Sequence, residues 1–191
     1  MNPNKFKVVL MGASSAGKTS IVIRISNDTF GGDQESTIGA AFISRDITTE
    51  KGQVVLHIWD TAGQERYRSL VPKYSQGSKA VIIVFDVSDI ESYDAAKSWV
   101  EEAIDQHAKR VKYYFVANKI DLEPAVDLEK VSQYAKENDL SYFQTSAKTG
   151  SGIRELFEAV ANDVSAMFPM NSADPDGILI AEGKKSSKGC C

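Results

Sequence analysis

One short motif near the N-terminus constrains the fold of this chain more than any other feature. GASSAGKT, Gly12 to Thr19, fits the pattern G-x-x-x-x-G-K-[ST] and lies between the apolar segment KFKVVLM and the helix-like segment KTSIVIRIS. Its glycines allow a close backbone approach that a Cβ would block, so successive N–H groups can surround a phosphate. A glycine-containing turn with an incidental lysine is the alternative. The flanking strand and helix favour a P-loop in a parallel α/β protein.

The residue types of this motif suit a polyphosphate that carries magnesium. Lys18 can reach the β- and γ-phosphates, and the positive end of the following helix adds to the attraction. Thr19 can present its hydroxyl to Mg²⁺. We expect seven residues of this loop to bind the nucleotide: Ser14, Ser15, Ala16, Gly17, Lys18, Thr19 and Ser20. Many enzyme classes share a P-loop, so this motif alone does not identify the nucleotide.

Short apolar runs rich in Val and Ile recur about every 30 residues and alternate with stretches of helical spacing. Two further segments, AAFISRDITT and QVVLHIWD, flank Lys51-Gly52, which suits a tight turn between antiparallel strands. We therefore predict an α/β fold with a six-stranded, mostly parallel sheet, one antiparallel strand and helices on both faces.

Two segments carry predictions about burial. The strand after the tight turn alternates between a core-facing set, Val54, Leu56 and Ile58, and a set that we expect to look outward, Val55, His57 and Trp59. The last helix should run from about Gly152 to Phe168 with an apolar stripe toward the core. Ser151 is its expected N-cap.

The chain has 191 residues and a hydrophobic content of 42%, which fits one compact domain that we place at residues 1–168. Residues 169–191 are dominated by Pro, Gly, Ser, Asp and Lys without a periodic apolar face, so we expect a flexible tail. The chain holds 26 acidic and 22 basic residues, and we expect no nucleic acid as partner. Neither a signal peptide nor a run of about 20 apolar residues is present, so we expect a cytosolic protein.

Two motifs that follow predicted strands indicate guanine. NKID, Asn118 to Asp121, stands at the end of an apolar strand, where a doubly wound sheet binds its ligands. Asp121 suits guanine because one carboxylate can accept from both N1–H and the N2 amine, whereas adenine offers no such pair. TSAK, Thr145 to Lys148, would bring backbone N–H groups to the base oxygen. Alone, NKID could be a strand-end turn; after a P-loop and before TSAK, it predicts a guanine site that includes Asn118, Lys119, Asp121, Ser146, Ala147 and Lys148.

WDTAGQE, which begins at Trp59, matches the needs of in-line phosphoryl transfer. Asp60 can hold Mg²⁺ through a water, Gly63 can lend its N–H to the γ-phosphate, and Gln64 can orient the attacking water. Thr37 could bind Mg²⁺ only while a γ-phosphate draws its loop inward, which would make hydrolysis a conformational signal. Thr37 could also be an ordinary loop hydroxyl, and Gln64 an ordinary surface residue. We predict a catalytic set of Lys18, Gly63 and Gln64, and a metal set of Thr19, Thr37 and Asp60.

Taken together, the motifs between Lys5 and Phe168 resemble the small GTPases of the Ras superfamily and, within it, the Rab family. IGAAF after Thr37, WDTAGQERYRSL and the terminal double cysteine look like Rab signatures, and QESTIGAAF resembles the early-endosomal branch. The resemblance implies a P-loop NTPase fold, GTP and GDP as ligands with Mg²⁺, and a slow GTPase switch in vesicle and endosomal membrane trafficking.

The resemblance also assigns roles to aromatic residues. It places Phe30 on one face of the guanine ring and Lys119 on the other. It implies an effector surface of Ile38, Phe42, Trp59 and Tyr74, although the aromatic triad could also be plain core. YSQGS from Tyr74, together with Ser14 and Ser15, departs from the common Rab pattern and leaves partner choice and hydrolysis rate open. No arginine lies between Phe30 and Thr37, so we expect slow unaided turnover and an activating protein that supplies the missing charge.

The only two cysteines, Cys190 and Cys191, stand side by side, where a mutual disulfide would be strained. The resemblance implies that both are geranylgeranylated; one lipid binds membranes marginally, whereas two can anchor stably. Unmodified exposed thiols are the alternative. The implied partners are an exchange factor, a GTPase-activating protein, effectors, a dissociation inhibitor and a prenylation escort. The protein itself should be a monomer on the cytoplasmic face of early endosomes or related endocytic vesicles, and cytosolic when extracted.

Two other functions remain open at this point. A P-loop metabolic kinase or ATPase would need a second substrate site and usually an arginine-bearing lid, for which no segment is left over. A pseudo-GTPase would bind GTP without hydrolysing it, although Lys18, Thr37, Asp60 and Gln64 are all present.

Overall fold

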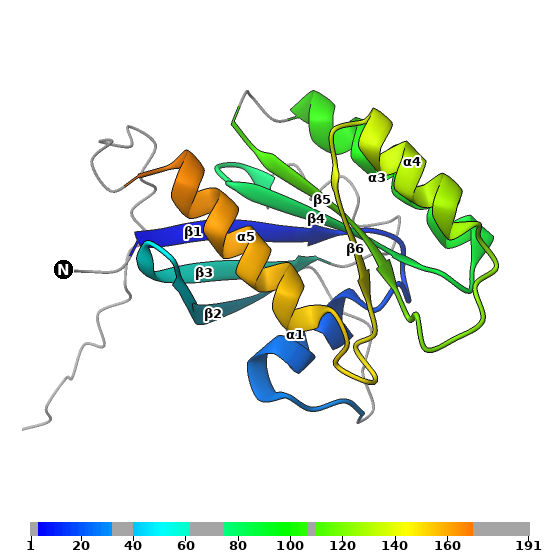
Figure 1. Cartoon of the computed structure of the whole chain (residues 1–191), viewed down its shortest axis with the longest axis horizontal. Coiled ribbons are helices and arrows are strands. Elements are labelled where there is room, and N and C mark those ends of the chain that lie inside the picture. Colours follow the sequence, from blue (N-terminus) through cyan, green and yellow to red (C-terminus); the bar gives the residue numbers. More distant parts are fainter. Residues whose placement is uncertain (1–3, 32–39, 62–74, 107–109, 170–191) are drawn as a thin grey trace, which may run out of the picture.

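A six-stranded sheet forms the middle layer of the protein in the computed structural model, which describes residues 4–31, 40–61, 75–106 and 110–169 (Figure 1). The strands are β1 (Asn4–Met11), β2 (Ala40–Thr49), β3 (Gly52–Thr61), β4 (Ala80–Asp86), β5 (Lys112–Asn118) and β6 (Ser141–Thr145). Their order is β2-β3-β1-β4-β5-β6, and β2 pairs antiparallel with β3 while the other pairs are parallel. The predicted mixed sheet is confirmed.

Helices cover both faces of this sheet, as the apolar spacing predicts. The described helices are α1 (Lys18–Asn27), α3 (Ile90–Gln106), α4 (Leu128–Glu137) and α5 (Ile153–Met167). In Figure 1, α1 and α5 lie beside β1 to β3, and α3 and α4 lie together beside β4 to β6. None of the helices in the described part of the chain is both long and apolar enough to span a membrane.

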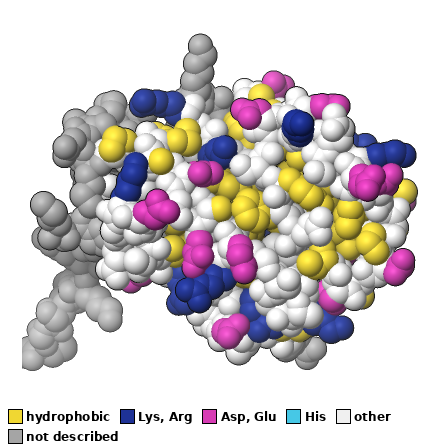
Figure 2. Space-filling view, viewed as in Figure 1, with side chains coloured by type: hydrophobic (Ala, Val, Ile, Leu, Met, Phe, Trp, Pro, Cys, Tyr) yellow, Lys and Arg dark blue, Asp and Glu magenta, His cyan; other side chains and the backbone are white. Residues whose placement is uncertain are grey.

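The centre of the sheet is apolar on both faces. Every residue of β4, from Ala80 to Asp86, is buried. Its alternate side chains enter two different clusters: Ile82 packs with α1 and α5, whereas Ile83 packs with α3 and α4. A strand that is covered on both faces has no solvent-exposed face that would favour polar residues, which explains the continuous apolar run AVIIVF. On the face of the molecule in Figure 2, acidic and basic side chains are interspersed around the exposed apolar ones.

The β2–β3 hairpin differs in two details from the predictions. The turn is formed by Glu50 and Lys51, and Gly52, with φ +116°, already begins β3. The second face of β3 is not fully outward, because Val55 is buried and Trp59 is half-buried. β3 lies between β1 and β2, so side chains of its neighbours shield this face. One of them is Lys7, whose Nζ lies 4.9 Å from the centroid of the Trp59 ring.

The start of α5 also corrects a prediction. Ser151 is not the N-cap; Gly152 occupies that position in a left-handed conformation, with φ +70°, and no side chain caps the helix. A Cβ at Gly152 would lie 2.1 Å from the carbonyl oxygen of Gln144, so the chain begins this helix in direct contact with β6. Phe168 is the C-cap.

Candidate nucleotide-binding site

Loops that carry the predicted motifs meet at one edge of the sheet. β1 leads directly into the P-loop, β3 carries Asp60 near its end, β5 ends at Asn118, and β6 ends at Thr145. These four strands run parallel, so their carboxyl ends lie side by side, and a crevice at such an edge is where doubly wound sheets bind ligands.

Two glycines let the P-loop pack closely against the neighbouring strands. A Cβ at Gly12, where φ is +137°, would lie 2.1 Å from the carbonyl oxygen of Val84 in β4. A Cβ at Gly17, where φ is +91°, would lie 2.3 Å from Nδ2 of Asn118. Between them Ser14 and Ser15 are exposed and Ala16 is buried, and Ser20 follows in the first turn of α1. The loop backbone therefore packs against Val84 and Asn118 at its two glycines, while the bend between them faces solvent.

Lys18 is a buried cation at the start of α1. Its side chain is almost inaccessible, at 5% exposure, and its Nζ donates to the carbonyl oxygens of Gly12, at 2.9 Å, and Ala13, at 2.7 Å. Burial lowers the pKa of Lys18 to about 8, and the nearby charge of Asp60 opposes that shift. A positive charge that is already desolvated beside the loop can interact strongly with phosphate oxygens.

Asn118 joins the P-loop to the loop after β6. Its Nδ2 donates to the carbonyl oxygen of Ala16 at 2.9 Å. Its Oδ1 accepts from the hydroxyl of Thr145 at 3.1 Å and from the backbone N–H of Ala147 at 3.3 Å. The residue is buried, so these hydrogen bonds are shielded from water. Asn118 thus fixes the distance between the loop expected to hold phosphate and the loop expected to hold the base.

Asp121 carries an ionised carboxylate next to that second loop. Ser146 donates its hydroxyl to Oδ1 at 2.6 Å, and Nζ of Lys148 lies 3.6 Å from Oδ2. The hydrogen bond from Ser146 lowers the pKa of Asp121 against the opposing effect of burial, and the charge of Lys148 lowers it further. An ionised carboxylate only accepts hydrogen bonds, and the Watson–Crick edge of guanine offers two adjacent donors.

The geometry agrees with a comparison against known protein families. A family model described as the Ras family matches residues 7–166, which include all the loops described above. The chain belongs to the Ras family. It is therefore a small GTPase, a class that binds GTP and GDP with Mg²⁺, hydrolyses GTP and acts as a molecular switch. The expected P-loop α/β fold and membership of the Ras superfamily are confirmed.

The Mg²⁺ used by small GTPases fits one pair of residues in this structure. Thr19 donates its hydroxyl to Oδ2 of Asp60 at 2.6 Å, and Asp60 is 1% exposed. The two oxygens come from α1 and β3, and the charge of Asp60 acts on the neighbouring Lys18. Mg²⁺ prefers such hard oxygen ligands and is usually shared between one or two protein groups and the phosphates of a nucleotide. Thr19 and Asp60 therefore suit a metal shared with the β- and γ-phosphates.

Asp86 belongs to this site, although sequence motifs did not reveal it. Its Oδ2 lies 2.6 Å from Nζ of Lys119, the residue expected on one face of the guanine ring. Burial raises the pKa of Asp86, but hydrogen bonds from Lys119 and Ser88 outweigh it and lower the pKa overall. With its ammonium held there, Lys119 can offer its aliphatic stem to a ring. The available signal was an acid that ends the apolar run AVIIVF at the carboxyl edge of a central strand.

Two aromatic residues that we expect to contact the nucleotide or effectors, Phe30 and Phe42, are exposed. Phe30 is 49% exposed just after α1. Phe42 is 46% exposed on β2, and its ring meets that of Trp59 edge-on with centroids 5.4 Å apart. The alternative that the triad is plain core is therefore wrong for Phe42.

Several predicted site residues lie outside the described part of the chain. They are Thr37, Ile38, Gly63, Gln64, Tyr74, Cys190 and Cys191. Their assignments remain predictions.

Proposed function

We propose that this Ras-family protein is a guanine-specific Rab-type switch that cycles between GTP and GDP and recruits effectors on endocytic membranes. One observation carries the guanine assignment: the Asp121 carboxylate is held ionised by Ser146 and Lys148 beside a P-loop with a buried Lys18. The Rab assignment is supported by IGAAF, WDTAGQERYRSL and the two terminal cysteines.

In this proposal, hydrolysis is direct attack of water on the γ-phosphorus, with release of GDP and phosphate. Lys18 binds the β- and γ-phosphate oxygens, whose negative charge the reaction redistributes. Bound Mg²⁺ would neutralise charge on the same oxygens, held by Thr19, Asp60 and Thr37. Gly63 donates its N–H to the γ-phosphate, and Gln64 orients the water. No arginine lies between Phe30 and Thr37, so turnover is slow until an activating protein supplies positive charge.

Replacing Gln64 by leucine should slow intrinsic hydrolysis at least about tenfold while nucleotide affinity stays close to wild type, because Gln64 acts on the water and not on the bound ligand. Single-turnover assays with GTP and ATP side by side measure this. The wild type should hydrolyse GTP and leave ATP intact. Equal use of both nucleotides would favour the kinase or ATPase alternative. Absence of any hydrolysis would favour the pseudo-GTPase. A normal hydrolysis rate in the leucine variant would show that Gln64 does not orient the water.

The effector surface in this proposal centres on the Phe42–Trp59 pair, together with Ile38 and Tyr74. Exposed aromatic side chains with a well-packed partner are typical anchors of protein interfaces. The β2–β3 hairpin holds Phe42 directly opposite Trp59 in the sheet. A γ-phosphate that draws Thr37 inward would move the neighbouring Ile38, and so couple nucleotide state to this surface.

Membrane attachment in this proposal depends on lipid at Cys190 and Cys191. A fluorescent fusion of the wild type should appear on endocytic vesicles, and a variant with both cysteines changed to serine should be diffuse in the cytosol, since two prenyl chains are lost. A variant with one serine should detach more readily than the wild type. Vesicle localisation of the double variant would contradict lipid anchoring, whereas wild-type fusion on another organelle would contradict the endocytic assignment alone.

A further inference from the structure

Arg24, in the second half of α1, forms hydrogen bonds with two separate segments of the chain. Its Nε donates to the carbonyl oxygen of Ala147 at 2.8 Å, and its NH2 group donates to that of Lys148 at 2.6 Å. Its NH1 group donates to the carbonyl oxygen of Asp28 at 2.9 Å and to Oδ1 of the same residue at 3.3 Å. One guanidinium therefore donates to the adjacent carbonyl groups of Ala147 and Lys148 and to the carbonyl group of Asp28, one helical turn after Arg24.

Both segments bear on the guanine site. Ala147 donates its backbone N–H to Asn118, and Lys148 places its ammonium near Asp121. Asp28 is the C-cap of α1, in a left-handed conformation with φ +55°, and lies two residues before Phe30. Arg24 thus contacts the back of the TSAK loop and the start of the segment that carries the expected ring-stacking residue.

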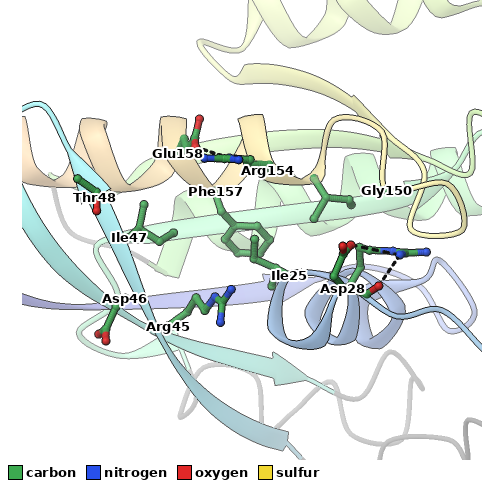
Figure 3. A pocket seen from close by; sticks show the side chains of 12 residues that line it. Ile25, Asp28, Arg45, Asp46, Ile47, Thr48, Gly150, Arg154, Phe157 and Glu158 are labelled. Carbon is green, nitrogen blue, oxygen red and sulfur yellow. Dashed lines mark hydrogen bonds and ion pairs between the residues drawn. The ribbon is translucent and has the colours of Figure 1, made fainter.

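The side chain of Arg24 is mostly buried, although its bonds to Asp28 and Lys148 are exposed. Its side chain is 14% exposed, and its Cδ and Nε lie within 4 Å of the position that a Cβ on Gly150 would take. It lines a pocket of ≈ 540 Å³ between α1, β2 and α5, with apolar side chains such as Phe157 at its floor and charged ones at its rim (Figure 3). Asp28 lies at one end of this pocket in Figure 3, and it accepts hydrogen bonds from Arg24.

The other two arginines of the pocket have simpler surroundings. Arg154 pairs with Glu158 on the same helix at 2.7 Å, and its side chain is 83% exposed. Arg45 donates to the carbonyl oxygen of Ser26 at 3.4 Å. Exposed ion pairs of the Arg154 kind contribute little. The hydrogen bond from the charged guanidinium of Arg24 to the carbonyl oxygen of Ala147 contributes more, because Ala147 is 3% exposed.

We propose that Arg24 is a positioning residue for the guanine base: it holds the TSAK loop, which we expect to approach the base oxygen, in place, and it thereby slows nucleotide release. This inference rests on the proposed guanine site. Arg24 does not touch the nucleotide in this role and acts through Ala147 and Lys148. Lysine cannot replace it, because a single ammonium cannot present the planar fork that serves two adjacent carbonyls and a third from another segment.

The test compares Arg24→Lys with the matched control Arg154→Lys in the full chain. We expect Arg24→Lys to release fluorescent GDP about tenfold faster or more, since it loses charge-assisted hydrogen bonds, and Arg154→Lys to release it at the wild-type rate. GDP and GTP should be affected alike, because the contacts lie at the base end. Equal release rates in wild type and Arg24→Lys would overturn the proposal.

A second measurement separates positioning from general loosening of the fold. 6-Thio-GDP keeps N1–H and the N2 amine of guanine but replaces the base oxygen with sulfur, a weaker acceptor. By competition against fluorescent GDP, the wild type should prefer GDP over 6-thio-GDP, and Arg24→Lys should lose most of that preference. If Arg24→Lys keeps the wild-type preference while both ligands bind more weakly, the residue is merely structural and the proposal is wrong.

A result against the proposed guanine site would differ from a result against the role of Arg24. A wild-type protein that binds GDP no better than ADP would contradict the proposed function whatever Arg24 does. A wild type with guanine preference and an Arg24→Lys variant that is unchanged would contradict this inference alone.

Discussion

Replacing Asp121 by asparagine should move the base preference of this small GTPase from guanine to xanthine. The amide places a donor where the carboxylate accepts from N1–H and the N2 amine, so guanine loses one hydrogen bond and faces an unpaired donor. Xanthine carries a carbonyl in place of the amine and can accept from that donor. Sites that recognise a ligand through buried hydrogen bonds discriminate by about 10⁴, so we expect GTP affinity to fall by about 10²–10⁴ and xanthosine triphosphate affinity to rise.

Competition binding against a fluorescent nucleotide measures both changes in one experiment. Asp127→Asn is a matched control, because it makes the same chemical change at the N-cap of α4, where asparagine caps equally well. The control should keep the wild-type preference. An Asp121→Asn variant that still prefers GTP over xanthosine triphosphate would show that Asp121 does not read the base.

Replacing Gly152 by alanine should destabilise the protein by about 2–4 kcal/mol, the sum of a left-handed conformation and a steric overlap. The added Cβ would lie 2.1 Å from the carbonyl oxygen of Gln144, which belongs to β6 and has little freedom to move. Because Ser146 donates its N–H to the carbonyl oxygen of Ser151, a displaced helix start should also disturb the TSAK loop and weaken guanine nucleotide binding.

Urea unfolding of the nucleotide-free protein gives the change in free energy of unfolding. Gly150→Ala is the control, since Gly150 also has a positive φ, of +87°, but a Cβ there would only reach Arg24 atoms at 3.8–3.9 Å. It should cost only the left-handed conformation, about 1–2 kcal/mol. Equal losses in the two variants would show that β6 and α5 separate easily and that the close approach is unimportant.

Apolar periodicity and local motifs were enough to predict most of the fold. Strands buried on both faces, such as β4, appear in the sequence as continuous apolar runs, and P-loop residues are consecutive, so both can be recognised locally. Gly152 shows where this approach fails. A serine beside the expected helix start suggested Ser151 as the N-cap. The N-cap is Gly152 instead, because the carbonyl of Gln144 in β6 leaves no room for a Cβ at that position. Neighbours in space, not in sequence, also explain why Val55 is buried.

The same limit applies to the site. Lys18, Asn118 and Asp121 could be predicted because each belongs to a short pattern with a known chemical role. Asp86 and Arg24 could not, because their roles depend on partners that the fold brings near. Arg24 and Ala147 are 123 positions apart in the sequence, and no local pattern predicts that bond.

The bridge formed by Asn118 has a consequence for how nucleotide is exchanged. One buried amide is hydrogen-bonded at the same time to Ala16 in the P-loop and to Thr145 and Ala147 at the base end. Displacing either loop removes part of the bonding that positions Asn118 for the other, so we expect the two ends of the ligand to be released in a coupled way. We therefore expect that a protein which accelerates exchange needs to displace only one of these two loops to loosen the hold on both ends of the nucleotide.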